Sequence, residues 1–312
     1  MKRGIEINSL SRSFGGIRAV DAIDLKVRHN TIFGLIGPDG AGKTTLMRML
    51  CSLMKPDSGT AQIGGLDIRT QGDEIINHLG YMPQRFSLYG DLTVMENLRF
   101  YSDIYQVPAD VREEKIEYLL EFSRLKKHSD KLADQLSGGM KQKLALCCNL
   151  IHTPDFLMLD EPTTGVDPVA RKELWKILFD LRDQGVTILI STPYMDEAQR
   201  CDEIGLIDSG RIIARDTPEN IINSFEKHII CIYSSDNYRA RDTALMQECV
   251  EDAYLLGEEL HIVVSDHEAA YGELEKALAS AGTEILSMEK IRPSLEDVFV
   301  SMIKGQKREG GV

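Results

Sequence analysis

A glycine-rich stretch near the start of the chain has the residue types and the spacing needed to hold a phosphate group. It reads Gly37, Pro38, Asp39, Gly40, Ala41, Gly42, Lys43, Thr44 and Thr45. The stretch matches the pattern G-x-x-x-x-G-K-[ST], in which glycines let backbone N–H groups turn towards an anion. The lysine adds a mobile positive charge, and the first threonine hydroxyl can ligate Mg²⁺. We therefore predict that this phosphate loop binds a nucleotide.

The residues on either side have the patterns that such a loop needs. Residues 31–36 are mostly apolar, which predicts a buried strand, and residues 45–53 predict a helix. A helix that begins at the loop points the positive end of its dipole at a bound phosphate. A chance glycine-rich turn has no need of a strand before it and a helix after it, so this setting favours the phosphate loop.

Two adjacent carboxylates, Asp160 and Glu161, follow the apolar run from Phe156 to Leu159. A buried strand brings such residues to its C-terminal end, where open α/β sheets bind ligands. We expect Asp160 to hold Mg²⁺ through water, and Glu161 to orient or deprotonate an attacking water. The alternative, a strand that ends in an acidic turn, is common by itself but is disfavoured behind a phosphate loop.

A third motif, Leu136 to Met140, precedes a predicted helix over about residues 141–152. Ser137 is a natural N-cap for that helix, and capping alone is the simplest interpretation. The two glycines after it are poor helix formers unless a backbone must come close to something, such as a second phosphate. The motif resembles the signature of the ATP-binding cassette (ABC) ATPases, with Met140 in place of the usual glutamine.

The resemblance to this family covers about residues 5–218 and implies roles for further residues. Phe14 would stack on adenine, although a core position for this ring is the alternative. Gln84 would sense Mg²⁺ and the attacking water, and Asp167 would lie in a loop that contacts a second cassette. Two cassettes would then enclose two ATP molecules, each between one phosphate loop and the partner's Ser137 and Gly139.

The site residues implied in this way form three sets. The catalytic set is Glu161, Gln84 and Lys43, and the metal set is Thr44, Gln84 and Asp160. The set that binds ATP is Phe14, residues 37–45, Ser137, Gly139 and Asp167. The expected cofactors are accordingly ATP and Mg²⁺.

The chain departs from the family pattern at Pro193, where a histidine usually contacts the γ-phosphate. Proline has no donor on its side chain and no backbone N–H. Tyr194 can supply a hydroxyl instead, although packing is the simpler interpretation of its ring. Two hypotheses follow: an ATPase that turns over at its own site, or a nucleotide-gated module with little turnover that forms half of an asymmetric pair.

Composition limits the location and the partners of the chain. The 312 residues carry 36 basic and 49 acidic side chains, a net charge of −13, which argues against nucleic acid as the main partner. The six cysteines lack C-x-x-C spacing, so we expect reduced, mostly buried thiols that suit the cytosol. No run approaches the roughly 20 apolar residues of a membrane span, and no leader pattern follows Met1.

The elements predict a fold of the α/β class. The expected core is a P-loop NTPase with an antiparallel β edge, formed by strands 5–10 and 22–28, and a helical insertion over about residues 88–151. Capping boxes at Thr93 with Glu96 and at Asp110 with Glu113 mark two helix starts in this insertion. A hairpin at residues 204–214 closes the core.

A second, smaller domain is expected after about residue 224, so that residues 1–224 bind ATP and residues 225–312 form an accessory domain. Strands at 228–233, 259–264 and 284–291, with helices near 239–248 and 267–281, predict an α+β module of ferredoxin-like type. This module, which ends in residues 293–299 and a helix, resembles the tail of ATPases in the daunorubicin-resistance branch of the family.

That branch implies a function in export. Its ATPases power separate integral-membrane permease subunits from the cytoplasmic face of the cell membrane, paired with a second ABC ATPase. Phe86, Leu88 and Tyr89 would dock a permease helix, although core packing of the insertion explains them equally well. A cassette protein acting on ribosomes or DNA is disfavoured, because such proteins generally carry two cassettes or a long coiled-coil insertion.

Overall fold

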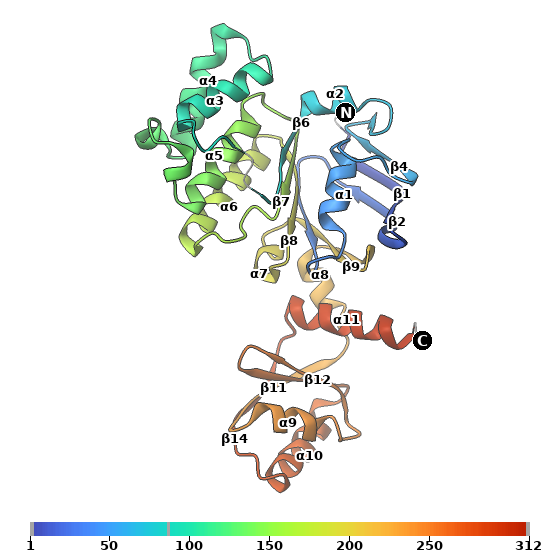
Figure 1. Ribbon diagram of the computed structural model, residues 1–312. Helices are drawn as coiled ribbons and strands as arrows, with labels where there is room; N and C mark the ends of the chain where they lie inside the picture. Colours follow the sequence, from blue (N-terminus) through green and yellow to red (C-terminus); the bar gives the residue numbers. More distant parts are fainter. Residues whose placement is uncertain (1–2, 86–87, 310–312) are drawn as a thin grey trace. The chain divides into compact units, whose positions relative to one another are not determined.

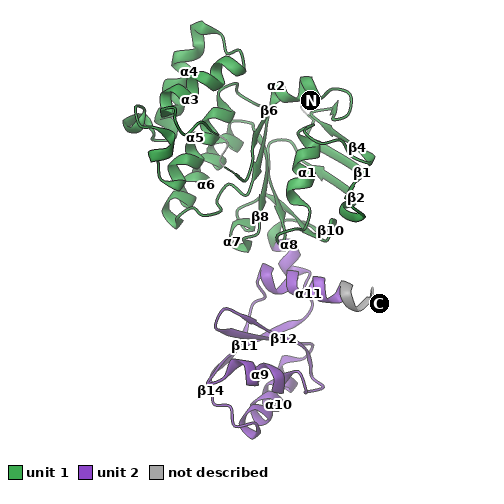
Figure 2. Cartoon of the chain, in the orientation of Figure 1, with its two compact units in different colours: residues 1–218 green, residues 219–312 purple. Residues whose placement is uncertain are grey.

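The computed structural model describes residues 3–85 and 88–309 (Figure 1). Its elements divide into two units, residues 1–218 and 219–312 (Figure 2). The division comes before the expected boundary at 224, because most of helix α8 (Pro218–Asn223) belongs to the second unit. Arg292 of that unit donates a hydrogen bond to Asn223 and lies 3.6 Å from Glu219, which ties the helix there.

A six-stranded sheet forms the centre of the first unit. The order of its strands is β10 (Arg211–Asp216), β9 (Glu203–Asp208), β3 (Ile32–Ile36), β8 (Thr187–Thr192), β7 (Phe156–Asp160) and β6 (Leu79–Met82). All neighbours are parallel except β10, which pairs antiparallel with β9 as the predicted hairpin. Every residue of β3, β7 and β8 is buried, which explains their unbroken apolar patterns.

A smaller antiparallel sheet packs near the first one. The order of its strands is β2 (Ile17–Val27), β1 (Ile5–Phe14), β4 (Ser58–Ile63) and β5 (Leu66–Asp67). The expectation that residues 5–10 form an edge strand is wrong, because β1 pairs with β2 on one side and β4 on the other. Side chains from both sheets and from helix α1 (Lys43–Leu50) share one apolar core.

The helical insertion contains α3 (Val94–Ile104), α4 (Ala109–Phe122) and α5 (Gly138–Leu150). The capping box of Thr93 and Glu96 is confirmed at the start of α3. The second predicted start is wrong, because α4 begins at Ala109 behind Pro108 and no side chain caps it. Asp110 lies inside the first turn instead, where its carboxylate faces the positive end of the helix dipole.

The second unit has the ferredoxin-like order of elements, β-α-β-β-α-β, followed by helix α11 (Leu295–Glu309). Its strands are β11 (His228–Ser234), β12 (Val250–Leu256), β13 (Glu259–Val264) and β14 (Ile285–Ile291), and its other helices are α9 (Asn237–Ala244) and α10 (His267–Ser280). The sheet order is β12-β13-β11-β14, all antiparallel. Strand β12 was missing from the prediction, since this edge strand is half-buried and lacks clean alternation.

Two further expectations from composition can be compared with the structure. All six cysteines are free and five are buried, so the prediction of mostly buried thiols is confirmed. Burial raises the pKa of the Cys147 thiol to about 11, which keeps this group protonated at neutral pH. Within the described ranges, no helix has both the length and the apolar character needed to cross a membrane.

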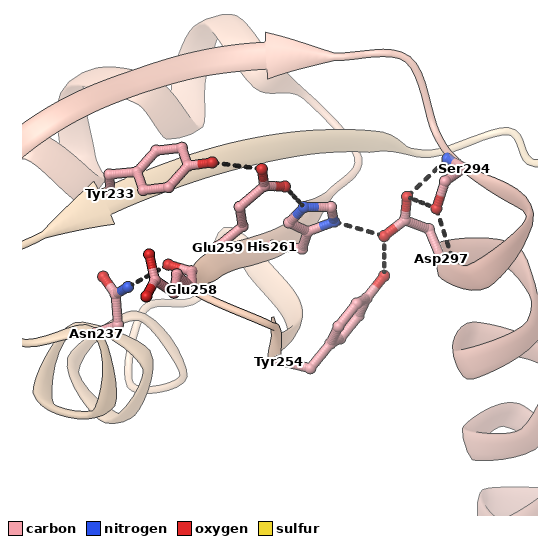
Figure 3. A network of polar contacts seen from close by, with 8 residues as sticks. All are labelled: Tyr233, Asn237, Tyr254, Glu258, Glu259, His261, Ser294 and Asp297. Carbon is pink, nitrogen blue, oxygen red and sulfur yellow. Dashed lines mark hydrogen bonds and ion pairs between the residues drawn. The ribbon is translucent and has the colours of Figure 1, made fainter. Parts of the chain in front are cut away.

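A buried carboxylate fastens α11 to the sheet of the second unit (Figure 3). Asp297 is fully buried and accepts hydrogen bonds from His261 Nδ1 at 2.6 Å and Tyr254 Oη at 3.0 Å. The Ser294 backbone N–H and hydroxyl both donate to its second oxygen at 2.7 Å. Burial alone would raise the pKa of Asp297, but the hydrogen bonds from His261 and Ser294 outweigh it and hold the pKa below its usual value.

We expect Asp297→Ala to lower the free energy of unfolding of the second unit by about 2–4 kcal/mol, because His261 and Tyr254 would lose a buried partner. The measurement is urea unfolding of the full chain, followed by far-UV circular dichroism. Glu296→Ala is the matched control, since that neighbouring carboxylate is exposed. Equal losses for the two variants would contradict the fastening role.

Candidate nucleotide site

The phosphate loop joins the end of β3 to the start of α1, so that Lys43 is the first residue of the helix. Gly42 before it has a φ of +104°, and a Cβ there would lie 2.1 Å from the Ala19 carbonyl oxygen. Only glycine fits this position. A cavity of about 250 Å³ opens over the loop, and its lining comprises Ala19, Asp39, Gly40, Gly42, Lys43, Thr44, Thr45, Gln84 and Glu161.

Lys43 is almost completely buried, with 4% of its side chain exposed. Its Nζ donates hydrogen bonds to the carbonyl oxygens of Gly37 at 2.8 Å and Pro38 at 3.0 Å. The same nitrogen lies 3.3 Å from Glu161 Oε1. A buried ammonium needs such partners, so the loop carbonyls and the carboxylate together hold the charge that a phosphate would meet.

Glu161 contacts Ser191, Gln84 and Thr164 in addition to Lys43. Its φ of +51° is left-handed, which is uncommon for a residue with a side chain, and its backbone N–H donates to both the carbonyl and the hydroxyl oxygen of Ser191. Gln84 Nε2 donates to its Oε2 at 2.7 Å, and the Thr164 hydroxyl lies 3.4 Å from the same atom. Sequence reasoning found Gln84 and Glu161 but missed Ser191, whose only signal was a polar residue at the end of the apolar strand β8.

Asp160 offers the oxygen that a metal ion needs. It is fully buried; Oδ1 accepts the Ser191 hydroxyl at 2.7 Å, while Oδ2 is buried without a hydrogen-bond partner among the described residues. Thr44 lies in the lining of the nearby cavity, as does Gln84. Hard oxygen ligands of this kind suit Mg²⁺, so the residues present fit the ion expected with ATP.

Comparisons with known proteins agree with this geometry. Residues 20–164 match the family model described as ABC transporter. The chain is 35% identical over 312 residues to the Nod factor export ATP-binding protein I of Ralstonia nicotianae, which covers 98% of this chain and 95% of that protein. The chain belongs to the ABC transporter ATPases.

A second relative of this ABC ATPase is the probable multidrug ABC transporter ATP-binding protein YbhF of Escherichia coli strain K12. The two are 38% identical over 305 residues, which is 96% of this chain but only 52% of the relative, so the chain spans about half of its length. A solved structure described as the ATP binding subunit of an ABC transporter is 29% identical, with a TM-score of 0.65 over 71% of this chain and 92% of that one.

The signature of the ABC ATPase begins α5 as expected. The Ser137 hydroxyl accepts a hydrogen bond from the Met140 backbone N–H, so its capping role is confirmed. A Cβ on Gly139 would lie 2.4 Å from Cβ of Ala170 on α6 (Pro168–Asp183), which gives this glycine a packing role as well. Neither Ser137 nor Gly139 lines the cavity over the chain's own phosphate loop.

Phe14 and Asp167 also lie outside the lining of that cavity. Phe14 ends β1 with 43% of its surface exposed, so its core alternative is wrong. The guanidinium of Arg12 lies 5.0 Å from its ring centroid. Asp167 caps α6, accepting hydrogen bonds from the N–H groups of Val169 and Ala170 at 3.0 Å. Contacts of these two residues with adenine or a second cassette stay predictions.

In the segment after β8, the ring of Tyr194 packs against Arg171. The guanidinium of Arg171 lies 4.7 Å from the Tyr194 ring centroid, and the ring is not part of the cavity lining. Arg171 also pairs with Glu197, which is fully buried and accepts the Thr163 hydroxyl at 3.0 Å. Sequence reasoning missed Arg171 and Glu197, because no local motif links α6 to this segment.

We expect Lys43→Ala to weaken ATP binding about 100-fold or more, because it removes the buried charge nearest the phosphates and leaves Glu161 without its ion pair. Equilibrium binding of a fluorescent ATP analogue to the purified chain measures the change. Lys55→Ala removes an exposed lysine and serves as the control. Equal ATP affinity in the parent and in Lys43→Ala would contradict our prediction that the phosphate loop is part of the binding site.

Proposed function

We propose that this chain hydrolyses ATP and thereby drives export through separate integral-membrane subunits. The observation that carries the proposal is the joint burial of Lys43 and Glu161 at one cavity, with Gln84 bonded to the same carboxylate. A site built only to bind nucleotide has no need of a buried carboxylate that can accept a proton from water. Family membership supports the same activity.

The residues suggest how the reaction proceeds. Water attacks the γ-phosphorus, its proton passes to the Glu161 carboxylate, and the bond from the γ-phosphorus to the bridging oxygen breaks to leave ADP and phosphate. Gln84 keeps the carboxylate oriented, and Lys43 neutralises the phosphate oxygens. Thr44, Gln84 and Asp160 would hold Mg²⁺, which would supply further positive charge to those oxygens.

The composite arrangement of two cassettes is part of this proposal. Ser137 and Gly139 lie away from the chain's own cavity, which supports their use at the site of a second ABC ATPase. The N-terminus of α5 is suited to an anion, because its backbone N–H groups are unpaired within the helix. Binding of ATP would close the pair, and release of phosphate would let it part.

Our proposals for the location and the cargo of this ABC ATPase are based on its relatives. The names of the two relatives describe probable multidrug transport and Nod factor export. We infer an exporter subunit on the cytoplasmic face of the cell membrane, attached through its permease. Leu88 and Tyr89 are docking candidates, since Tyr89 is 48% exposed although its ring also contacts Phe100. Phe86, the third candidate, lies outside the described residues.

A second candidate function is the weakly hydrolytic half of an asymmetric pair. Pro193 favours it, because the position next to β8 lacks a donor for the γ-phosphate. The contact of Tyr194 with Arg171 also favours this function. A ring that packs on Arg171 is held there and does not extend towards the nucleotide. Glu161 favours the hydrolytic function, because an intact base is present.

We expect Glu161→Gln to keep ATP binding and to lower turnover by about 10²-fold or more, because an amide can hold Gln84 but is a far weaker base. The measurements are steady-state ATP hydrolysis and the fraction of dimer in the presence of ATP, which should rise. Glu74→Gln changes an exposed carboxylate and serves as the control. Unchanged turnover and unchanged dimer fraction would favour the non-hydrolytic module.

We expect the parent chain alone to turn over slowly and Pro193→His to raise its rate, approaching the roughly 10²- to 10³-fold that one well-placed donor contributes. ATP hydrolysis at matched concentration, with dimerisation checked, measures this. Tyr194→Phe is the companion variant, and its rate should equal that of the parent. A parent rate of about 1–10 per second that falls in Tyr194→Phe would show that the tyrosine hydroxyl fills the role.

A further inference from the structure

The face of the second unit that carries His261 brings a thiol, an imidazole and a carboxylate together. Cys231 on β11 lies directly opposite His261 on β13, so the two side chains share one face of the sheet. Glu259 is two residues before His261 on the same strand and therefore also shares that face. Ligand atoms of the three residues lie within 4.8 Å of one another.

The imidazole of His261 lies between the carboxylates of Glu259 and Asp297 (Figure 3). Its Nδ1 is hydrogen-bonded at 2.6 Å to Asp297, and its Nε2 lies 3.0 Å from Glu259 Oε2. Metal-binding histidines usually hold one nitrogen against a carboxylate in this way, which fixes the ring and leaves the other nitrogen for the ion. Asp297 is itself held by Tyr254 and Ser294, so the support is rigid.

The simpler interpretation is a protonated histidine that only joins two carboxylates. That interpretation explains His261, Asp297 and Glu259 but gives no reason for a thiol at the same place. Cys231 is 3% exposed and converges with two metal-binding residue types, and within residues 3–85 and 88–309 no other group of three or more such residues converges in this way. The chemistry of the set therefore points to a cation.

We propose that Cys231, Glu259 and His261 bind a divalent cation of the Zn²⁺ class, with Asp297 as the outer carboxylate. Thiolate and imidazole ligands favour such ions over Mg²⁺ and Ca²⁺, so this site is chemically distinct from the nucleotide site. Bonds of about 2.0–2.3 Å to a tetrahedral ion place ligand atoms about 3.5 Å apart, within the range of the present group, whose atoms lie within 4.8 Å of one another with 3.0 Å between His261 Nε2 and Glu259 Oε2. Water completes the fourth position.

The charges of the direct ligands balance that of the ion. A thiolate from Cys231 and the carboxylate of Glu259 offset its two positive charges, while neutral His261 keeps the proton on Nδ1 and donates it in a hydrogen bond to Asp297. The ion would join β11 to β13 and, through Asp297, reinforce the attachment of α11. Its role is thus structural, in a small domain with a limited apolar core.

The experiment uses the untagged full chain, treated with chelator, freed of nucleotide and kept in excess Mg²⁺. Co²⁺ is titrated in, and its visible absorption and thiolate charge-transfer band are recorded. We expect one Co²⁺ per chain, a thiolate band, and displacement by an equivalent of Zn²⁺. Absence of saturable binding, or of a thiolate band in the parent, would overturn the proposal.

Variants locate the site. Cys231→Ser should abolish the thiolate band and weaken Co²⁺ binding by about 100-fold or more, whereas Cys249→Ser, a half-buried thiol of the same unit, should change neither. Asp297→Asn should weaken binding by the roughly 10- to 100-fold typical of an outer-shell change. Glu259→Gln is the variant least disruptive to folding, since 43% of that side chain is exposed. Binding that survives both Cys231→Ser and Glu259→Gln would place the ion elsewhere.

Discussion

Burial removes the water that stabilises a charged group. A buried ammonium and a buried carboxylate therefore need each other's opposite charge close by. Lys43 and Glu161 meet this condition together, at 4% and 7% side-chain exposure and 3.3 Å between Nζ and Oε1. They come from segments that are distant in sequence, one following β3 and the other following β7. The parallel sheet brings the C-terminal ends of these strands to one edge, and β8 between them contributes Ser191, which fixes both Asp160 and Glu161.

Motifs whose residues are close together in the sequence could be predicted without the structure. The phosphate loop, the acidic end of β7 and the capping box at Thr93 each lie within a few residues, and each has a physical requirement that few residue types meet. The second helix start failed because the same spacing at Asp110 competes with Pro108, which sets the backbone one residue before α4. The capping-box spacing takes no account of a preceding proline, so it predicted the wrong helix start.

Local sequence patterns say little about which side chains from different helices and strands contact each other. Strand β12 pairs along only one side, with β13, so half-burial removed the alternation that would have revealed it. Arg171 and Tyr194 meet because α6 and the segment after β8 pack together, and no spacing in the sequence encodes this contact. The packing role of Gly139 could not be predicted for the same reason. Its lack of a Cβ suits a phosphate, but it also suits the approach of Ala170 on α6.

The ion pair also bears on when the base becomes active. While Lys43 lies against Glu161, its ammonium occupies the position beside Oε1, at 3.3 Å. Under the proposed function, a bound γ-phosphate competes for the same ammonium and draws it away from Oε1. Gln84 still holds Oε2, so the carboxylate would keep its orientation while losing the positive charge beside it. Oε1 would then be open to water only when substrate is present, which couples proton transfer to occupancy of the phosphate loop through two residues that the fold already brings together.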